Sequence, residues 1–212
     1  MGISISISME YSHPSYGNKL FWLSKRIFDV IVSLLLLPFL LIIAMFLLVF
    51  NRFYNRGRLL FIQERMGKNC ETFFAIKFRS MSATNEITRK YDEPIEIDRI
   101  TPLGGILRKT RIDELPQILN VLKGDMSLIG PRPDYYVHAL EYLNYVQGYR
   151  DRYTIRPGIT GLSQVRIGYA DNIETVSKKV SIDNYYIENP SYIIELKIVF
   201  STIFIIIRGM GK

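Results

Sequence analysis

Two adjacent carboxylates, Asp113 and Glu114, lie in a segment rich in cations. Arg108 precedes the pair, and Arg132 follows it within a rigid Gly-Pro-Arg-Pro corner. An ionised aspartate beside a cation-bound phosphate can attack phosphorus and form an acyl phosphate. Arginines stabilise the charge on a transferred phosphoryl group. The pattern indicates a phosphate-handling site in which Asp113 is the nucleophile and Glu114 is a general base or a metal ligand.

The same dyad also has a purely structural interpretation. The apolar pattern that follows predicts a helix beginning close to Asp113, and Pro116 is tolerated in such a first turn. Thr110 and Asp113 then have the spacing of a capping box. There the helix dipole would keep Asp113 ionised and attract phosphate oxygens. A capping pair does not account for the surrounding cations or for the Gly-Pro-Arg-Pro corner.

Two other segments present cations at the ends of expected elements. Residues 59–81 predict two short strands around a turn that begins at Gly67, and the second strand ends with Lys77 and Arg79. An edge strand protected by charge would show the same pattern. Arg156 opens a second rigid turn, Arg-Pro-Gly-Ile-Thr-Gly.

Residues 27–50 form an apolar run, and Asp29 is the one charged residue in it. We expect this run to anchor the cation-rich segments at a membrane. As a straight helix the run would reach roughly 36 Å, enough to cross the hydrocarbon core of a bilayer. Pro38 at its centre kinks or breaks a helix, and both flanks are basic, which favours the cytoplasmic side for both ends. A helix that enters the membrane, breaks and returns fits these features, and so does a kinked spanning helix.

The C-terminal half predicts mainly helices. Residues 134–153 are rich in tyrosine at near-helical spacing, which suits core packing or a membrane interface. Residues 171–189 predict a polar helix. The apolar segment 192–207 contains Glu195 and Lys197, and its uninterrupted part is too short to span a bilayer. We expect that segment to lie in the interface or to cover the core.

The net charge and the cysteine and histidine content limit which ligands and metals the protein can bind. The net charge of +7 favours an anionic partner. Cys70 is the one cysteine, which excludes an intramolecular disulfide and a cysteine-rich zinc site, and two histidines make a His/Cys metal centre a poor interpretation. Oxygen-ligated Mg²⁺ remains compatible. No helix-turn-helix, RNP or zinc-finger pattern is present, so we expect no nucleic acid among the partners.

The order of motifs resembles the bacterial sugar transferase family, the monotopic phosphoglycosyl transferases, from Lys25 to Ile207. The motifs are Lys25-Arg26-x-x-Asp29, Phe61-x-Gln63-x-Arg65-x-Gly67, Lys77-Phe78-Arg79-Ser80-Met81, Asp113-Glu114-Leu115-Pro116-Gln117, the segment from Asn120 to Ser127, Gly130-Pro131-Arg132-Pro133 and Arg156-Pro157-Gly158-Ile159-Thr160-Gly161. Each motif alone is weak, but together and in this order they are specific.

The resemblance implies a reaction and its partners. Members of this family transfer a sugar-1-phosphate from a UDP-sugar to polyprenyl (undecaprenyl) phosphate, release UMP, use Mg²⁺ and start lipid-linked glycan assembly. They work on the cytosolic face of the bacterial inner membrane, among phospholipids. By this resemblance Asp113 is the nucleophile that forms a phosphosugar intermediate, Glu114 is its partner, and Asp113 is also the expected contact of Mg²⁺. The cations expected to bind substrate phosphate are Lys77, Arg79, Arg108, Arg132 and Arg156.

The resemblance also implies the architecture. We expect a mostly α fold with a small β-hairpin (α+β), interfacial amphipathic helices and a re-entrant membrane helix broken near Pro38. Residues 1–18 would be a polar N-terminal segment, residues 19–58 the membrane anchor with its flanks, and residues 59–212 the catalytic domain on the cytosolic face. The chain looks like a minimal catalytic form without additional spanning helices, and a second copy of it is a candidate partner.

A non-catalytic interpretation remains open at this point. The net charge and the apolar run would equally suit a basic membrane scaffold of a glycan-assembly complex, which docks anionic lipids or another protein. Such a scaffold would tolerate substitution of Asp113 and Glu114, whereas charge reversal at Arg52, Arg56 and Arg58 would release it from the membrane.

Overall fold

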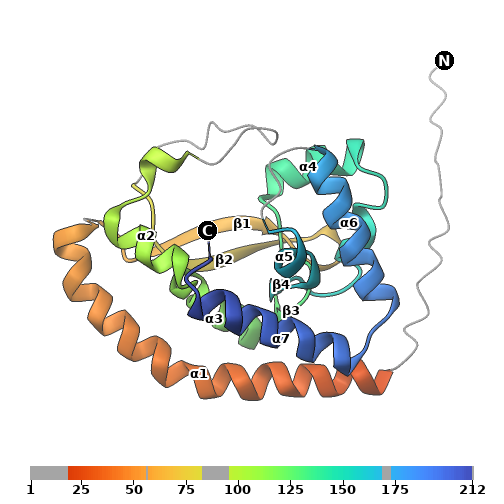
Figure 1. Cartoon of the computed structure of the whole chain (residues 1–212), viewed down its shortest axis with the longest axis horizontal. Helices are drawn as coiled ribbons and strands as arrows, with labels where there is room; N and C mark the ends of the chain where they lie inside the picture. The colour runs from red at the N-terminus through yellow and green to blue at the C-terminus, as the bar shows by residue number, and fades with distance from the viewer. Residues whose placement is uncertain (1–18, 56, 83–95, 169–172, 212) are drawn as a thin grey trace.

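The computed structural model describes residues 19–55, 57–82, 96–168 and 173–211. Its elements, with η for a 3₁₀ helix, are α1 (Lys19–Tyr54), β1 (Leu60–Met66), η1 (Lys68–Cys70), β2 (Thr72–Phe78), η2 (Ile97–Arg99), α2 (Pro102–Lys109), η3 (Ile112–Gln117), α3 (Ile118–Lys123), β3 (Ser127–Ile129), α4 (Tyr136–Tyr145), η4 (Arg150–Tyr153), β4 (Gly158–Thr160), α5 (Leu162–Arg166), α6 (Ile173–Glu188) and α7 (Tyr192–Ile207). The fold is mostly helical with little sheet, as the sequence predicts (Figure 1).

The predicted hairpin is confirmed. Strands β1 and β2 pair antiparallel from Leu60 opposite Phe78 to Met66 opposite Thr72. The turn between them contains η1, where Asn69 and Cys70 both adopt left-handed backbone angles with φ of 57° and 61°. The hairpin crosses the middle of the molecule in Figure 1, and its β2 edge faces η3 and α3.

A second, parallel pair of strands was not predicted. Ser127 of β3 lies opposite Gly158 of β4, and Ile129 lies opposite Thr160. The two backbone segments approach so closely that a β-carbon on Gly158 would lie 2.1 Å from the backbone nitrogen of Gly130. This pairing places the Gly-Pro-Arg-Pro corner beside the Arg-Pro-Gly-Ile-Thr-Gly turn, so the two rigid turns form one unit.

Helix α1 lies across the base of the molecule, and one of its faces is buried against the rest (Figure 1). The buried side chains of α1 and of the turn after it are Phe21, Lys25, Asp29, Ser33, Leu40, Leu47, Asn51 and Asn55. They recur every four or seven residues, which is the spacing of one helix face. Polar contacts fix both ends of this face to the same body.

At its start, the Asp29 carboxylate accepts hydrogen bonds from the Ser127 hydroxyl at 2.7 Å and from the Leu128 N–H at 3.1 Å. At its end, the Asn55 side chain donates to the Arg79 carbonyl oxygen at 2.7 Å. Both ends of α1 therefore lie on the side of the remaining protein.

The structure refines the expectation of a break at Pro38. Helix α1 continues through Pro38 as one 36-residue helix, bent along its length. A proline removes one backbone hydrogen bond and bends a helix without necessarily ending it. The buried Ser33 hydroxyl has no hydrogen-bond partner in the structure, so it does not satisfy a carbonyl released at the bend. Residues before Lys19 lie outside the described residues, and the proposed division into an anchor and a catalytic domain stays a prediction.

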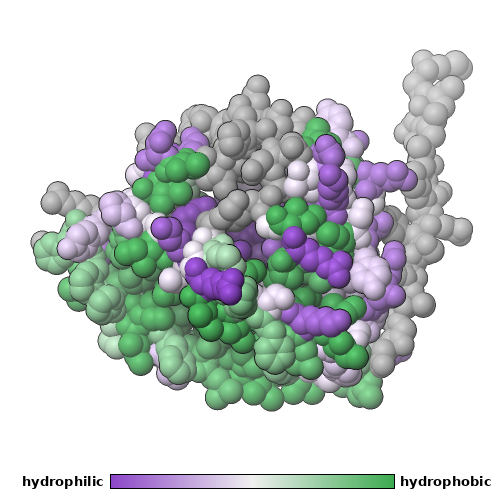
Figure 2. All heavy atoms as spheres, in the orientation of Figure 1, coloured by the Kyte–Doolittle hydropathy of each residue, from purple (hydrophilic) through white to green (hydrophobic). Residues whose placement is uncertain are grey.

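The outer faces of α1 and α7 expose large apolar side chains. They include Leu35, Phe39, Ile42 and Phe46 from α1, and Ile193, Phe200, Phe204 and Ile207 from α7. Figure 2 shows them as one continuous hydrophobic surface along the lower side of the molecule, which we name the apolar face. Among the described residues, α1 is the one helix long and apolar enough to cross a membrane by length and composition.

Helices α4 and α6 lie toward the right of the molecule in Figure 1, whereas α3 lies below the hairpin, next to α1. Helices α4 and α6 enclose a core cluster that contains Met66 from β1 and the buried tyrosines Tyr142, Tyr149 and Tyr153. Most of the tyrosine-rich segment therefore packs internally. Helix α6 matches the predicted polar helix, and α7 buries only Ile198 below a tenth exposure while its outer side joins the apolar face.

Candidate active site

The carboxylate pair lies in the first turn of η3, close to where the sequence predicts a helix start. Arg111 precedes it in the left-handed region with φ of 56°, which turns the chain out of α2. The capping-box interpretation is wrong: the Thr110 hydroxyl donates to carbonyl oxygens of α2, at 2.8 Å for Ile106, and η3 has no side-chain cap. The tight 3₁₀ turn is thus held by α2 behind it and by Pro116 within it.

Glu114 is buried and paired with three cations. Its carboxylate accepts hydrogen bonds from Lys77 Nζ at 2.9 Å, from Arg111 Nη1 at 3.3 Å and from Arg132. Burial opposes ionisation, but the charges of Arg132 and Lys77 outweigh it and hold the pKa of Glu114 well below its usual range. Glu114 is therefore an ionised anchor for the cations around the dyad.

Asp113 is also buried, at 7% exposure, but its carboxylate has different surroundings. Among the described residues its carboxylate accepts no hydrogen bond and forms no ion pair. Burial, followed by the charge of Glu114, raises the pKa of Asp113 to about 6, although Lys77 and Arg108 act in the opposite direction. The expectation that the helix start keeps Asp113 ionised did not anticipate that burial raises this pKa. Near neutral pH, Asp113 is therefore mainly ionised, and its oxygens are not engaged by hydrogen bonds within the described residues.

Lys77 reaches the dyad because β2 is fixed to α3. The Asn120 side chain donates to the Phe74 carbonyl oxygen at 2.8 Å and accepts from the Ile76 N–H at 3.0 Å. It thereby continues the hydrogen bonding of the β2 edge and sets the register that directs Lys77 toward Glu114. The sequence contains this residue only as the first position of the Asn120–Ser127 motif, and its role was not foreseen.

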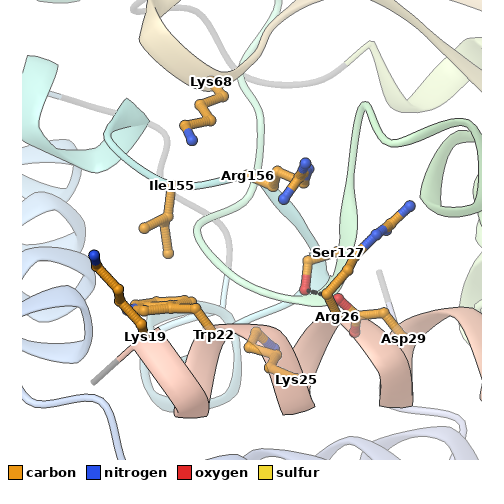
Figure 3. A pocket seen from close by; sticks show the side chains of 9 residues that line it. All are labelled: Lys19, Trp22, Lys25, Arg26, Asp29, Lys68, Ser127, Ile155 and Arg156. Carbon is orange, nitrogen blue, oxygen red and sulfur yellow. Dashed lines mark hydrogen bonds between the residues drawn. The ribbon is translucent and has the colours of Figure 1, made fainter. Parts of the chain in front are cut away.

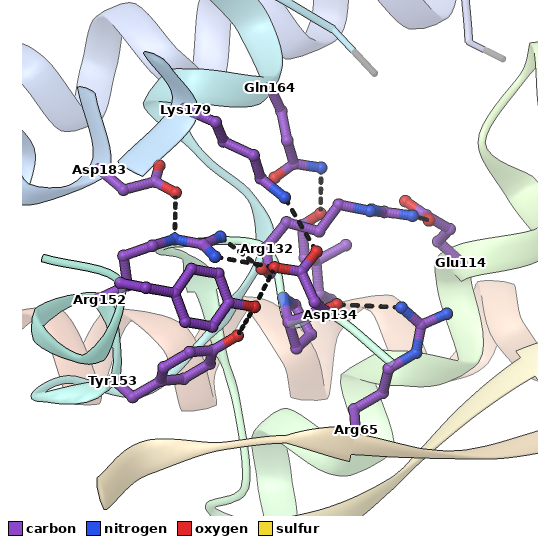
Figure 4. A network of polar contacts seen from close by, with 12 residues as sticks. Arg65, Glu114, Arg132, Asp134, Arg152, Tyr153, Gln164, Lys179 and Asp183 are labelled. Atoms are coloured by element: carbon purple, nitrogen blue, oxygen red, sulfur yellow. Dashed lines mark hydrogen bonds and ion pairs between the residues drawn. The ribbon is translucent and has the colours of Figure 1, made fainter. Parts of the chain in front are cut away.

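Arg132 is held in place by a second group of polar side chains, which we name the buried network. Figure 4 shows Asp134, Arg152, Lys179 and Asp183 of this network, and Tyr149 joins it through a hydrogen bond to Asp134. Arg152 has no exposed surface, donates to Asp183 and to Asp134 at 2.8 Å each, and donates to the Arg132 carbonyl oxygen at 2.9 Å. Lys179 donates to Asp134 at 3.0 Å. The network therefore fixes the backbone of the corner whose side chain contacts Glu114.

This network was also not foreseen from the sequence. Its members come from the segment after the corner, from η4 and the residue before it, and from α6, and directly bonded members lie up to 45 residues apart. A usable signal was present in α6, where Lys179 and Asp183 share one helix face with the buried Val176 and Val180. Two opposite charges four residues apart on an apolar face indicate buried ion pairing.

The structure brings together some, but not all, of the cations predicted for the site. Lys77 and Arg132 contact the dyad, and the charge of Arg108 acts on Asp113 while its Nη1 lies 3.8 Å from the Met81 sulfur. Arg79 instead donates to the Asn55 carbonyl oxygen at the end of α1. Arg156 donates to the Gly124 carbonyl oxygen at 2.8 Å and lines a different pocket. Phosphate binding by any of the five stays a prediction.

The donor set around the dyad suits Mg²⁺ only together with a substrate. No cluster of three or more potential metal ligands occurs among the described residues, and both oxygens of Glu114 already accept hydrogen bonds. Asp113 is the carboxylate with free oxygens. Mg²⁺ is commonly held by one or two carboxylates together with substrate phosphates and water, so Asp113 and a diphosphate would form a plausible coordination set.

The arrangement has the parts needed for substitution at phosphorus. A buried carboxylate with free oxygens lies among Lys77, Arg108 and Arg132, which would attract a phosphate and neutralise its charge. The second carboxylate orients two of these cations. The model of the family described as bacterial sugar transferase matches residues 20–209, nine-tenths of the chain.

The chain belongs to the bacterial sugar transferase family.

Curated relatives agree with this assignment. A protein from Aeromonas hydrophila, named UDP-N-acetylgalactosamine-undecaprenyl-phosphate N-acetylgalactosaminephosphotransferase, is 38% identical over 88% of the chain and 44% of its own length. The UDP-glucose:undecaprenyl-phosphate glucose-1-phosphate transferase of Klebsiella pneumoniae is 38% identical over 85% of the chain and 39% of its own length. The exopolysaccharide production protein PSS of Rhizobium leguminosarum bv. phaseoli is 38% identical over 88% of the chain and 97% of its length. The chain thus spans about two-fifths of the first two relatives and nearly all of the third.

Proposed function

We propose that this bacterial sugar transferase moves a sugar-1-phosphate from a UDP-sugar to undecaprenyl phosphate through a covalent intermediate on Asp113. The observation that carries the proposal is the contrast within the dyad. Within the described part of the chain, Glu114 is paired with Lys77, Arg111 and Arg132. The buried Asp113 carboxylate, on which the charges of Lys77, Arg108 and Arg132 act, has no hydrogen-bond or ion-pair partner there. The names of the relatives supply the donor and acceptor classes.

In the first step an oxygen of Asp113 attacks the β-phosphorus of the UDP-sugar. The bond from this phosphorus to the oxygen that bridges the two phosphates breaks, and UMP leaves with that oxygen. In the second step an oxygen of undecaprenyl phosphate attacks the phosphorus of the acyl phosphate. The bond to Asp113 breaks, the carboxylate is regenerated, and the product is an undecaprenyl diphosphate sugar. Mg²⁺, when bound, would neutralise charge on the donor diphosphate.

We place this reaction at the cytosolic face of the bacterial inner membrane, with α1 as a re-entrant anchor. Both ends of α1 are tied to the same body, through Asp29 and through Asn55, and its outer side belongs to the apolar face. A helix held in this way suits re-entrance better than a crossing that would separate its ends. The lipid phosphate would then arrive at the surface that carries the dyad, while the UDP-sugar stays in the cytosol.

Release of UMP without acceptor tests the covalent step. Detergent-solubilised protein is incubated with UDP-glucose, UDP-galactose, UDP-N-acetylglucosamine and UDP-N-acetylgalactosamine in turn, with Mg²⁺. We expect one of them to give a burst of about one UMP per protein molecule, and we expect Asp113→Asn to reduce its rate at least about a thousandfold. Asp151→Asn, which changes an exposed aspartate of η4, is the matched control.

Three results would contradict the proposal. Release of UMP only after undecaprenyl phosphate is added would indicate direct displacement without an enzyme-bound phosphosugar. A normal burst in Asp113→Asn would exclude Asp113 as the nucleophile. Absence of UMP with every donor and acceptor would favour the non-catalytic scaffold instead.

A further inference from the structure

A second cation-rich site lies apart from the dyad. A pocket of about 290 Å³ is lined by the first three turns of α1, the hairpin turn and the segments around β3 and β4 (Figure 3). Its lining residues are Lys19, Trp22, Lys25, Arg26, Asp29, Lys68, Ser127, Ile155 and Arg156. None of Lys77, Arg108, Arg132, Asp113 and Glu114 belongs to it. The pocket is therefore distinct from the proposed catalytic centre.

Positive charge in this pocket exceeds negative charge. Five of the nine lining residues are cationic, and Asp29 is the one carboxylate. Both oxygens of Asp29 already accept hydrogen bonds, from Ser127 and Leu128. Lys25 is balanced by Glu195 at 2.7 Å, but Lys19, Arg26, Lys68 and Arg156 form no ion pair within the described residues. Such an excess favours an anionic ligand.

Two of the cations are held in place. Arg26 Nη1 donates to the Val121 carbonyl oxygen and Arg156 Nε donates to the Gly124 carbonyl oxygen, each at 2.8 Å. These acceptors lie at the C-terminal end of α3, where free carbonyl groups attract cations. The two like charges also lie near enough to repel each other. Holding two arginines together at one pocket has an energetic cost that a bound anion would offset.

The surroundings indicate what kind of anion this is. Leu20, Leu23 and Ile27, from the same turns of α1, are exposed and belong to the apolar face, whereas Trp22 lines the pocket. Tryptophan and lysine at the border of an apolar surface are typical of the headgroup level of a bilayer. The volume suits a phosphate with a small polar group, leaving acyl chains to lie along the apolar face.

We propose that this pocket binds the headgroup phosphate of an anionic phospholipid, such as phosphatidylglycerol, and thereby fixes the start of α1 at the membrane surface. The acceptor phosphate must reach the Asp113 phosphosugar, so a pocket that shares no residue with the dyad is suited to a structural lipid. The proposal rests on the membrane location argued under the proposed function, but not on the transfer chemistry.

The chain contains a single tryptophan, Trp22, which makes the pocket directly observable. The full chain in neutral detergent micelles is titrated with short-chain phosphatidylglycerol while Trp22 fluorescence is recorded. We expect a saturable change that phosphatidylcholine of equal chain length does not produce. Lys19→Gln combined with Lys68→Gln should weaken binding and raise the half-saturation concentration at least about tenfold.

The matched control is Lys123→Gln combined with Lys178→Gln. It removes two charges whose side chains are 72% and 64% exposed outside the pocket, so an equal loss of affinity would overturn the proposal in favour of general surface attraction. Inorganic phosphate that produces the same change would assign the pocket to a soluble anion. Undecaprenyl phosphate that binds more tightly and displaces phosphatidylglycerol would assign it to the acceptor. Either result would overturn the structural-lipid assignment.

Failure of this proposal can be distinguished from failure of the catalytic one. Asp113→Asn should abolish the UMP burst and leave the Trp22 titration unchanged, because Asp113 does not line the pocket. Loss of both properties in Asp113→Asn would show that the variant is misfolded or that the two sites are coupled, and coupling would overturn their separation.

Discussion

Two regions of this protein use the same chemical groups for different ends. In the buried network, Asp134 accepts from Arg152 at 2.8 Å, from Lys179 at 3.0 Å and from the Tyr149 hydroxyl at 2.7 Å. Burial disfavours its charge, but Lys179 and Arg152 outweigh burial and lower the pKa of Asp134 far below its usual range. In the dyad, cations likewise lower the pKa of Glu114, whereas Asp113 has no partner among the residues that the structure describes and its pKa is raised.

The difference shows what distinguishes a reactive carboxylate from a structural one here. Burial and nearby cations are common to both regions. A carboxylate whose oxygens are all engaged stabilises the fold, and one left without hydrogen bonds keeps its oxygens available to attack phosphorus. Arg132 joins the two regions, because its side chain contacts Glu114 and its carbonyl oxygen accepts from Arg152.

The largest expected effect is a difference in stability between a variant of the buried network and a variant of the dyad. Asp134→Asn removes the charge that balances Arg152 and Lys179, so we expect it to lower the free energy of unfolding by about 3–5 kcal/mol. Asp113→Asn removes a buried charge that forms no ion pair within the described residues and should leave stability unchanged or raise it at pH 7.5. Thermal unfolding in detergent measures both. An equal loss in the two variants would break the distinction between the regions.

The next largest effect concerns Arg132, which connects the dyad to the buried network. Arg132→Ala keeps the carbonyl oxygen that Arg152 binds but removes the guanidinium from Glu114, so we expect UMP release to fall about 10²- to 10³-fold. We expect a much smaller change in thermal stability than for Asp134→Asn. Arg79→Ala is the contrasting variant, since its side chain contacts the end of α1 rather than the dyad. Equal losses of activity would place Arg79 in the substrate site after all.

These contrasts also show what the sequence could predict. Asp113, Glu114, Arg132 and Lys77 were identified correctly as neighbours in the site, because rigid motifs and a strand end constrain where they point. The contacts of Arg79 and Arg156 could not be predicted, since neither strand alternation nor a turn motif specifies which group from another segment a side chain contacts. The two helices of the apolar face could be predicted from their apolar runs alone.

Long-range structure was less accessible. The parallel pairing of β3 with β4 involves only three residues on each side, too few for a sequence pattern. Asp134, Arg152 and Asp183 meet from separate segments, and a single sequence carries no record of such distant pairing. At Pro38 the sequence predicts a distortion but not its extent, because packing against the body helps to decide whether a helix bends or ends.

The raised pKa of Asp113 predicts a pH dependence of the burst. Since that pKa is about 6, UMP release should fall about tenfold per pH unit below it, as the nucleophile becomes protonated. A carboxyl whose pKa is raised on folding stabilises the protein below its unfolded pKa, and this stabilisation is lost as pH rises through about 6. Asp113→Asn should therefore gain stability relative to wild type between pH 4 and 6.5. A burst rate that stays constant from pH 7 to pH 5 would contradict the assignment.

The smallest effect lies outside both regions, in the turn of the hairpin. Cys70 has a φ of 61°, where a side chain is strained and glycine is not, and its thiol is half-buried against the cluster around Met66. We expect Cys70→Gly to be more stable than Cys70→Ala by about 1 kcal/mol, because both lose the sulfur and only glycine relieves the backbone. Chemical denaturation of the two variants measures this difference. Both should keep the wild-type UMP burst and its pH profile, since the turn that holds Cys70 precedes β2, whereas Lys77 lies near the other end of that strand. A shifted profile would mean that the hairpin turn is coupled through β2 to Lys77, and the dyad would then depend on more of the fold than its immediate contacts suggest.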